Sequence, residues 1–105
     1  MPKDPVLQTI KEMIDSHPII LFMKGSRLMP ACGFSARVVE ILNRFGVPYE
    51  TKNVLDDDAL REGIKVYSNW PTLPQLYVNG VFIGGCDIVC ESDAKGELAP
   101  LIRGL

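Results

Sequence analysis

The chain has little of what would mark a membrane-spanning, secreted or nucleic-acid-binding protein. Its longest apolar run covers residues 19–23, far short of the roughly 18 residues that suggest a membrane span. Three cysteines among 105 residues are too few for a disulfide-stapled secreted domain. Eleven basic and 13 acidic residues leave a net charge of −2, which gives no general attraction to nucleic acid or to an anionic membrane. We therefore expect no nucleic acid and no membrane among the partners, and a reducing compartment.

The length and composition predict one domain over residues 1–105. A chain of 105 residues is too short for a second core, and 47% hydrophobic with 23% charged residues is an ordinary globular mixture. The N-terminus carries neither the apolar core of a signal peptide nor an Arg/Ser-rich transit segment. A cytoplasmic location is the first expectation, and a mature form in the mitochondrial matrix or a plastid is the alternative.

Apolar spacing divides the chain into helices and strands in the order α-β-α-β-α-β-β-α-α. Helices are predicted over about residues 5–17, 32–45, 56–68, 87–95 and 97–103, and strands over residues 19–23, 48–54, 75–78 and 81–83. Asp4 and Asp87 are the expected caps of the first and fourth helices, and Asn79-Gly80 is the expected turn of a hairpin. This pattern fits an α/β fold in which helices flank both faces of a mixed four-stranded sheet.

Cys32 stands at a predicted helix N-terminus, where backbone amides and the helix dipole stabilise a thiolate. Lys24 adds positive charge if the loop before this helix folds back. Ser35 occupies the position at which a C-x-x-C motif would carry its second thiol, which excludes dithiol exchange within the motif. The thiolate must then pair with an external thiol, with a distant cysteine or with a metal. An incidental cysteine without a role is the alternative that the spacing alone leaves open.

Four short motifs give the chain a resemblance to a known family. They are Lys24-Gly25, Cys32-Gly33-Phe34-Ser35, Trp70-Pro71-Thr72-Leu73-Pro74-Gln75 and Gly84-Gly85-Cys86-Asp87. In this order and spacing, from about residue 6 to residue 105, the chain resembles a CGFS-type monothiol glutaredoxin. The resemblance implies a thioredoxin-like fold, glutathione as cofactor, and a [2Fe-2S] cluster that the protein holds and hands on. It also implies weak or absent oxidoreductase activity.

The resemblance assigns residues 72–74, Thr72, Leu73 and Pro74, to glutathione binding. Only about 5–6% of X-Pro bonds in folded proteins are cis, so the local sequence favours a trans bond before Pro74. The family implies a cis bond, which turns the backbone of Leu73 toward Cys32 for antiparallel pairing with an extended peptide such as glutathione. On local evidence, a rigid turn before a strand explains residues 70–74 equally well.

The start of the fourth predicted helix is assigned in the same way to the γ-glutamyl end of glutathione. Free amides at Cys86 and Asp87, after Gly85, would bind its carboxylate, and the side chain of Asp87 would meet its ammonium group. From the spacing alone, Asp87 is a helix N-cap.

Three basic residues are assigned to the glycyl carboxylate at the other end. Arg61 and Lys65 are i,i+4 neighbours on one helix face, and Lys24 would join them from the loop. A solvated helix face is the alternative for the Arg61–Lys65 pair.

Four further residues have two interpretations or no assigned chemistry. Phe34 either stacks over the ligand or fills the core, and its helical spacing to Val38 favours at least partial burial. Cys86 is either packed, which we favour, or a thiol that reaches Cys32 when oxidised. Cys90 is interpreted as core filler, and His17 as a surface residue.

Three functional hypotheses follow. In the first, Cys32 and a bound glutathione each supply one sulfur to a [2Fe-2S] cluster, and a second protomer completes the four ligands. Cys86 and Cys90 are alternative ligands, so the sequence by itself does not require a dimer. The resemblance adds a heteromeric form with a BolA-type protein and transfer to apo iron-sulfur acceptor proteins. In the second, Cys32 takes glutathione from a glutathionylated protein as a mixed disulfide. The third is a redox sensor that uses a Cys32–Cys86 disulfide.

Overall fold

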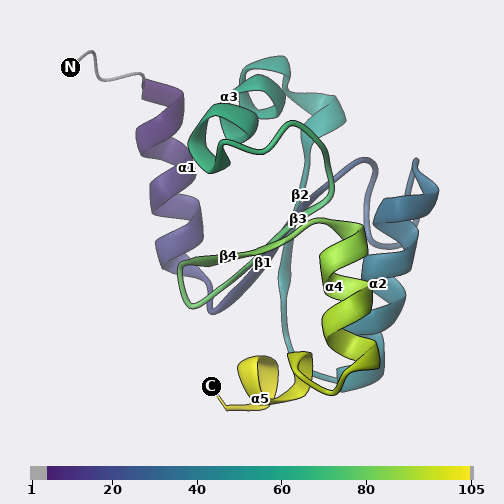
Figure 1. The fold of residues 1–105 in the computed structure, drawn as a ribbon. Helices are drawn as coiled ribbons and strands as arrows, with labels where there is room; N and C mark the ends of the chain where they lie inside the picture. The colour runs from purple at the N-terminus through teal and green to yellow at the C-terminus, as the bar shows by residue number, and fades with distance from the viewer. Residues whose placement is uncertain (1–4, 105) are drawn as a thin grey trace.

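The computed structural model describes residues 5–104, and its elements follow the predicted order (Figure 1). The helices are α1 (Pro5–Ser16), α2 (Gly33–Phe45), α3 (Asp58–Ser68), α4 (Cys86–Ala94) and α5 (Leu98–Arg103), and a 3₁₀ turn, η1, covers Val54–Asp56. The strands are β1 (Ile19–Met23), β2 (Glu50–Asn53), β3 (Gln75–Val78) and β4 (Val81–Gly84). The expected cap Asp4 lies outside the described residues.

The four strands form one mixed sheet in the order β2-β1-β3-β4. Strand β1 runs parallel to β2 and antiparallel to β3, and β3 and β4 form a hairpin. Asn79 and Gly80 at its turn have φ values of 52° and 81°. Positive φ at both central residues is what a two-residue hairpin turn matched to the strand twist requires, and this explains the Asn-Gly pair.

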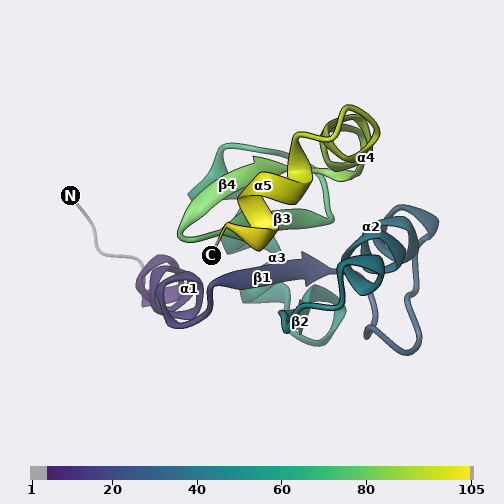
Figure 2. The same ribbon diagram turned by 90° about the horizontal axis from the view of Figure 1, so that it is seen from below.

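The central strand β1 is buried on both faces of the sheet, which explains its uninterrupted apolar sequence. Ile19, Leu21 and Met23 belong to one core cluster, together with residues of α2, α4 and α5. Ile20 and Phe22 belong to a second cluster, with residues of α1 and α3. Figure 2 shows these helices on opposite sides of the strands. The predicted α/β architecture is confirmed.

Two of the predicted boundaries that differ from the structure do so because polar side chains cap neighbouring backbone. Strand β2 ends at Asn53, whose side chain accepts a hydrogen bond from the Leu55 amide and opens η1. Helix α3 begins two residues later than expected because Asp57 is its cap and accepts from the Leu60 amide at 3.1 Å. The predicted cap Asp87 is wrong. Gly85 holds the cap position with φ −89° and ψ −165°, which leaves Asp87 inside the first turn of α4.

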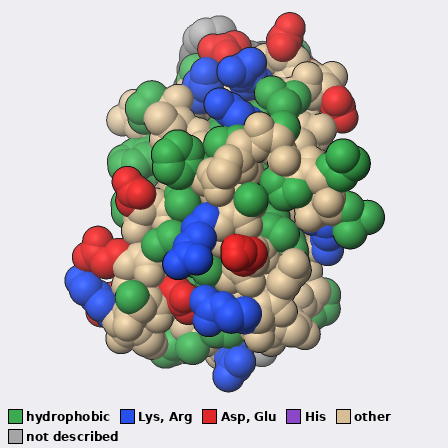
Figure 3. All heavy atoms as spheres, turned by 90° about the vertical axis from the view of Figure 1, so that its right-hand side faces the viewer, with side chains coloured by type: hydrophobic (Ala, Val, Ile, Leu, Met, Phe, Trp, Pro, Cys, Tyr) green, Lys and Arg blue, Asp and Glu red, His purple; other side chains and the backbone are tan. Residues whose placement is uncertain are grey.

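The surface carries no extended field of one charge on the face that bears α2 and α4. Basic and acidic side chains are interspersed there (Figure 3), as the small net charge leads one to expect. Within residues 5–104, no helix combines the length and the apolar character that a bilayer crossing needs.

Candidate functional site

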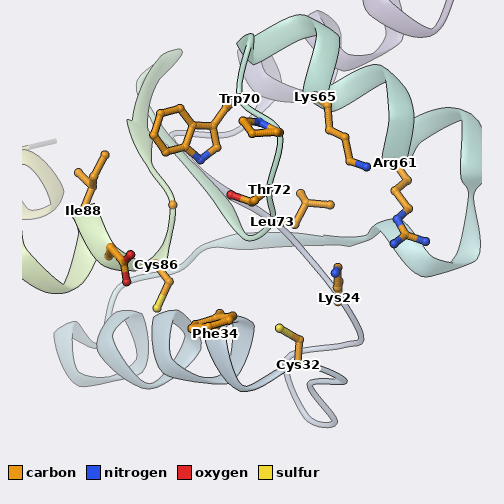
Figure 4. A pocket seen from close by; sticks show the side chains of 13 residues that line it. Lys24, Cys32, Phe34, Arg61, Lys65, Trp70, Thr72, Leu73, Cys86 and Ile88 are labelled. Atoms are coloured by element: carbon orange, nitrogen blue, oxygen red, sulfur yellow. The ribbon is translucent and has the colours of Figure 1, made fainter.

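A cleft of about 460 Å³ opens where the loop after β1, the turn before β3 and the first turn of α4 come together (Figure 4). Ten of the residues singled out in the sequence line it, namely Lys24, Cys32, Phe34, Arg61, Lys65, Thr72, Leu73, Gly85, Cys86 and Asp87. Pro74 is buried and is not part of the lining. The fold therefore brings four distant segments of the sequence to one site.

Cys32 is the N-cap residue of α2, and its backbone is extended, with φ −149° and ψ 135°. The amide of Ser35 makes the largest contribution that lowers the pKa of the Cys32 thiol, the amide of Phe34 and the charge of Lys24 add to it, and burial opposes it. The residue is half-buried, so its sulfur keeps access to the cleft. The site thus holds an accessible thiol that is biased toward its thiolate form.

Ser35, at the place of a second thiol, has a structural role that the motif did not predict. Its side chain is fully buried, and its hydroxyl accepts a hydrogen bond from the Lys24 amide at 3.1 Å. This contact ties the end of β1 to the first turn of α2. As a result, Lys24 is held beside the N-terminus of α2, which carries Cys32.

The loop between β1 and α2 is anchored to β2 and to the residue before it by contacts that the sequence analysis did not predict. The Gly25 amide donates to the Asn53 side chain at 2.9 Å. The Arg27 guanidinium donates to the Tyr49 carbonyl at 2.6 Å and lies 4.4 Å above the Tyr49 ring. Directly after these anchors, Leu28 and Met29 project outward, 88% and 78% exposed. The loop is therefore fixed at its base and presents an apolar tip near Cys32.

Lys24, Arg61 and Lys65 gather at one end of the cleft. Figure 4 shows Arg61 and Lys65 reaching from α3 toward Lys24. Lys65 is paired with Glu62 at 3.2 Å. The Nε atom of Arg61 is buried and has no hydrogen-bond partner among the residues that the structure describes. This end of the cleft is thus a cationic pocket with unused donor capacity, suited to a carboxylate.

Residues 70–73 form another wall of the cleft, and the turn that they belong to contains a cis Leu73–Pro74 peptide bond. The cis bond that the resemblance implied is confirmed, against the expectation from local sequence. Gln75 is fully buried and shapes this turn, since its side-chain amide donates to the carbonyls of Trp70 at 3.1 Å and Thr72 at 3.2 Å. A buried glutamine directly after the proline is a further residue whose role the sequence analysis did not assign.

Comparisons with known proteins agree with this arrangement. The sequence profile of the glutaredoxin family matches residues 19–83. A monothiol glutaredoxin of Synechocystis is 53% identical over 90% of this chain and 88% of its own length. Monothiol glutaredoxin 2 of Rickettsia prowazekii is 52% identical over 98% of this chain and 96% of its own length. The chain belongs to the glutaredoxin family, in its monothiol branch.

Solved glutaredoxin structures share the fold. The solution structure of reduced apo GrxS14 from poplar is 46% identical, with a TM-score of 0.81 over 92% of this chain and 89% of its own. The crystal structure of a buckwheat glutaredoxin–glutathione complex is 26% identical, with a TM-score of 0.85 over 98% of this chain and 96% of its own. The thioredoxin-like fold of this glutaredoxin is thereby shown.

Phe34 of this glutaredoxin is 62% exposed, so the expected partial burial is wrong. The buried stripe of α2 begins one residue later, at Ser35, and continues through Val38. Phe34 therefore misses the sheet and lies over the cleft, as Figure 4 shows. The other interpretation of Phe34, a ring that lies beside the ligand, is the one compatible with this position.

His17, expected at the surface, is partly exposed, and its Nε2 atom lies 3.7 Å from Oε2 of Glu50.

Cys86 and Cys90 of the glutaredoxin are half-buried and pack against the core cluster of α2 and α5. The favoured interpretation of both as packed residues agrees with this. Burial, followed by the interaction with Cys90, raises the pKa of Cys86 to about 11. Cys32 and Cys86 thus have pKa values shifted in opposite directions within one cleft.

Site-resolved alkylation tests this contrast. Only a thiolate reacts, so the rate at each cysteine rises with pH through that cysteine's pKa. In a pH series with iodoacetamide, read by peptide mass spectrometry, we expect Cys32 to reach half its maximal rate below the value of about 8.5 for free cysteine, and Cys86 well above it. Cys86 is the internal control. Equal midpoints for the two cysteines would contradict the electrostatic description of the site.

Proposed function

We propose that this glutaredoxin binds glutathione in the cleft and, as a pair of copies, carries a [2Fe-2S] cluster that it delivers to apo iron-sulfur acceptor proteins. The observation that carries the proposal is the accessible Cys32 thiol, with its lowered pKa, beside a cationic pocket. A soft thiolate is a suitable ligand for an iron-sulfur cluster, and the cationic pocket suits a small anionic thiol compound.

Glutathione matches the two ends of the cleft. Its glycyl carboxylate suits the pocket of Lys24, Arg61 and Lys65, where the Arg61 Nε is available to donate. At the other end, the first turn of α4 offers backbone amides for the γ-glutamyl carboxylate, and Asp87 offers a carboxylate for its ammonium group. The buckwheat relative, which was crystallised with glutathione, supports this assignment.

The cluster, as cargo, needs more sulfur ligands than one cleft contains. A [2Fe-2S] cluster takes four protein or cofactor ligands. Within residues 5–104, no group of three or more His, Cys, Asp or Glu side chains is placed to hold a metal. Figure 4 shows the Phe34 ring between the sulfurs of Cys32 and Cys86. Cys32 and a glutathione thiol therefore supply two ligands, and a second copy of the chain supplies the other two.

The apolar loop tip supports a paired state when the cluster is bound. Leu28, Met29 and Phe34 are all largely exposed, and they lie on the loop and helix that carry Cys32. Pairing two copies through the cluster would bury these side chains and exclude water from the iron. The same two open ligand positions would accept a BolA-type protein that offers histidine or cysteine. A cytoplasmic location, or a mature form in an organelle, remains part of the proposal.

The lowered pKa of Cys32 also supports a second candidate function, glutathione-dependent thiol exchange. The Cys32 thiolate would attack the glutathione sulfur of a glutathionylated protein, forming a mixed disulfide and releasing the protein thiolate. A second glutathione thiolate would then attack that mixed disulfide, which returns Cys32 and releases glutathione disulfide. This reaction needs one thiol and the same cleft.

Anaerobic reconstitution with iron and sulfide separates the two functions. With glutathione, we expect the visible charge-transfer absorption of a [2Fe-2S] cluster and elution as a dimer in size-exclusion chromatography. Without glutathione, both are expected to be lost, because half of the sulfur ligands are missing. If the protein gains no absorption with glutathione but turns over a glutathione mixed disulfide rapidly, thiol exchange is the function and the carrier proposal is wrong.

A further inference from the structure

Two cysteines on α4 place their sulfur atoms within reach of a single bridging atom. The Sγ atoms of Cys86 and Cys90 lie 3.8 Å apart. Cys86 opens the helix and Cys90 follows one turn later, so both side chains are on the same helix face. Both residues are half-buried, and Cys86 reaches the cleft. The proposed carrier function uses neither sulfur.

The helix geometry disfavours a disulfide between these two thiols. Residues four apart on a helix have Cβ atoms about 5–6 Å apart. A disulfide needs Cβ atoms at about 3.5–4.5 Å, so forming one would distort the first turn of α4. The intact helix therefore holds Cys86 and Cys90 as a reduced pair.

A metal ion bridges a wider gap than an S–S bond. Two metal–sulfur bonds of about 2.3 Å span ~3.8 Å at a tetrahedral angle and ~4.6 Å in a linear arrangement. The observed separation lies at the short end of this range. A small rotation of either side chain would widen the separation of the two sulfurs to the larger values in this range. Two bonds to one ion can therefore form without a change in the helix.

The number of ligands selects the kind of ion. In the part of the chain that the structure describes, no third His, Cys, Asp or Glu side chain joins this pair. Zinc in proteins takes four ligands and is poorly served by two. A soft monovalent ion of the Cu(I) class favours thiolate ligands and is satisfied by two of them.

The surrounding charge fits such a complex. One monovalent cation and two thiolates carry a net charge of −1. The Arg37 guanidinium, on α2, lies beside Cys90, and the interaction with that sulfur raises the pKa of Arg37. The positive N-terminal end of α4 lies at Cys86, although the neighbouring Asp87 opposes it. An anionic two-sulfur complex therefore has a cation within reach.

We propose that Cys86 and Cys90 form a two-sulfur binding site for a soft monovalent metal ion of the Cu(I) class, separate from the thiol at Cys32. Binding exchanges the two thiol protons for the metal ion. Both protons pass to the solvent, two Cu–S bonds form, and no group is oxidised or reduced. The site is a feature of this chain's own cysteine pair and does not depend on the cluster.

Anaerobic competition for Cu(I) tests the site. The starting protein is Cys32→Ser, which removes the third thiol and with it any cluster. We expect it to withdraw one Cu(I) per chain from a chromogenic Cu(I) chelator. The added substitutions Cys86→Ala or Cys90→Ala are each expected to abolish this withdrawal, while far-UV circular dichroism stays unchanged. Withdrawal that persists in either variant, or is absent from the starting protein, overturns the proposal.

A second measurement needs no substitution on α4. In the Cys32→Ser protein, one equivalent of Cu(I) is expected to protect both Cys86 and Cys90 from N-ethylmaleimide, as read by peptide mass spectrometry. X-ray absorption should report two sulfur neighbours for the copper. Protection of one cysteine alone would show a single-thiol complex and would refute the two-sulfur site. Because both tests lack Cys32, their failure leaves the cluster-carrier proposal standing.

Discussion

Replacing Cys32 by serine is expected to abolish cluster uptake and thiol exchange together. The substitution keeps the size and extended backbone of the α2 cap, but a hydroxyl does not ionise near neutral pH as the Cys32 thiol does. Neither a soft ligand for iron nor a nucleophile for a mixed disulfide remains. Reconstitution with iron, sulfide and glutathione should give no charge-transfer absorption, and turnover of a glutathione mixed disulfide should fall to the background rate.

Cys86→Ser is the matched control for this loss. It removes a sulfur that lines the same cleft, but one whose pKa is raised to about 11 and which is separated from Cys32 by the Phe34 ring. We expect normal reconstitution and normal elution as a dimer. If Cys86→Ser loses the cluster as fully as Cys32→Ser, Cys86 is itself a ligand and the assignment of ligands to glutathione fails.

The sequence predicted the fold well wherever the deciding signal was local. The apolar run of β1, the Asn79-Gly80 turn and the predicted end of the second helix at residue 45, which Gly46 caps, each place an element from a few adjacent residues. The cap of α4 was misplaced because Gly85, Cys86 and Asp87 offer competing cap positions within one turn. The cap falls at Gly85, directly after β4 ends at Gly84. Where a strand ends depends on its pairing with distant residues, which the local sequence does not give.

The site was predicted less completely because the contacts that position its functional residues join segments far apart in the sequence. Cys32 and Lys24 stand out by charge and motif. Ser35 and Gly25 belong to the same motifs, but the motifs do not predict their contacts, since Ser35 bonds 11 residues back to Lys24 and Gly25 bonds 28 residues forward to Asn53. Phe34 was misjudged for a related reason. Helical spacing gives the face of α2, but not how far the sheet extends beneath its first turn.

Replacing Gly25 by alanine is expected to unfold the loop that positions Cys32. Gly25 has φ +88°, and a Cβ there would collide with the Ala31 nitrogen and lie 2.6 Å from the Met29 carbonyl oxygen. Both obstacles are backbone, and the Ala31 amide already donates to the Lys24 carbonyl at 2.9 Å. The free energy of unfolding should fall by at least about 2 kcal/mol, measured by chemical denaturation. Displacing Lys24 should also raise the pKa of Cys32, visible as slower alkylation at neutral pH.

Gly33→Ala is the control that separates this collision from a general need for glycine beside Cys32. Gly33 is the first residue of α2, its φ is not in the left-handed region, and a Cβ there would meet no atom within 4 Å. Alanine also favours a helix over glycine by up to about 1 kcal/mol in helix interiors, and by less in a first turn. We therefore expect unchanged or slightly higher stability. A loss equal to that of Gly25→Ala would mean that the steric explanation for Gly25 is wrong.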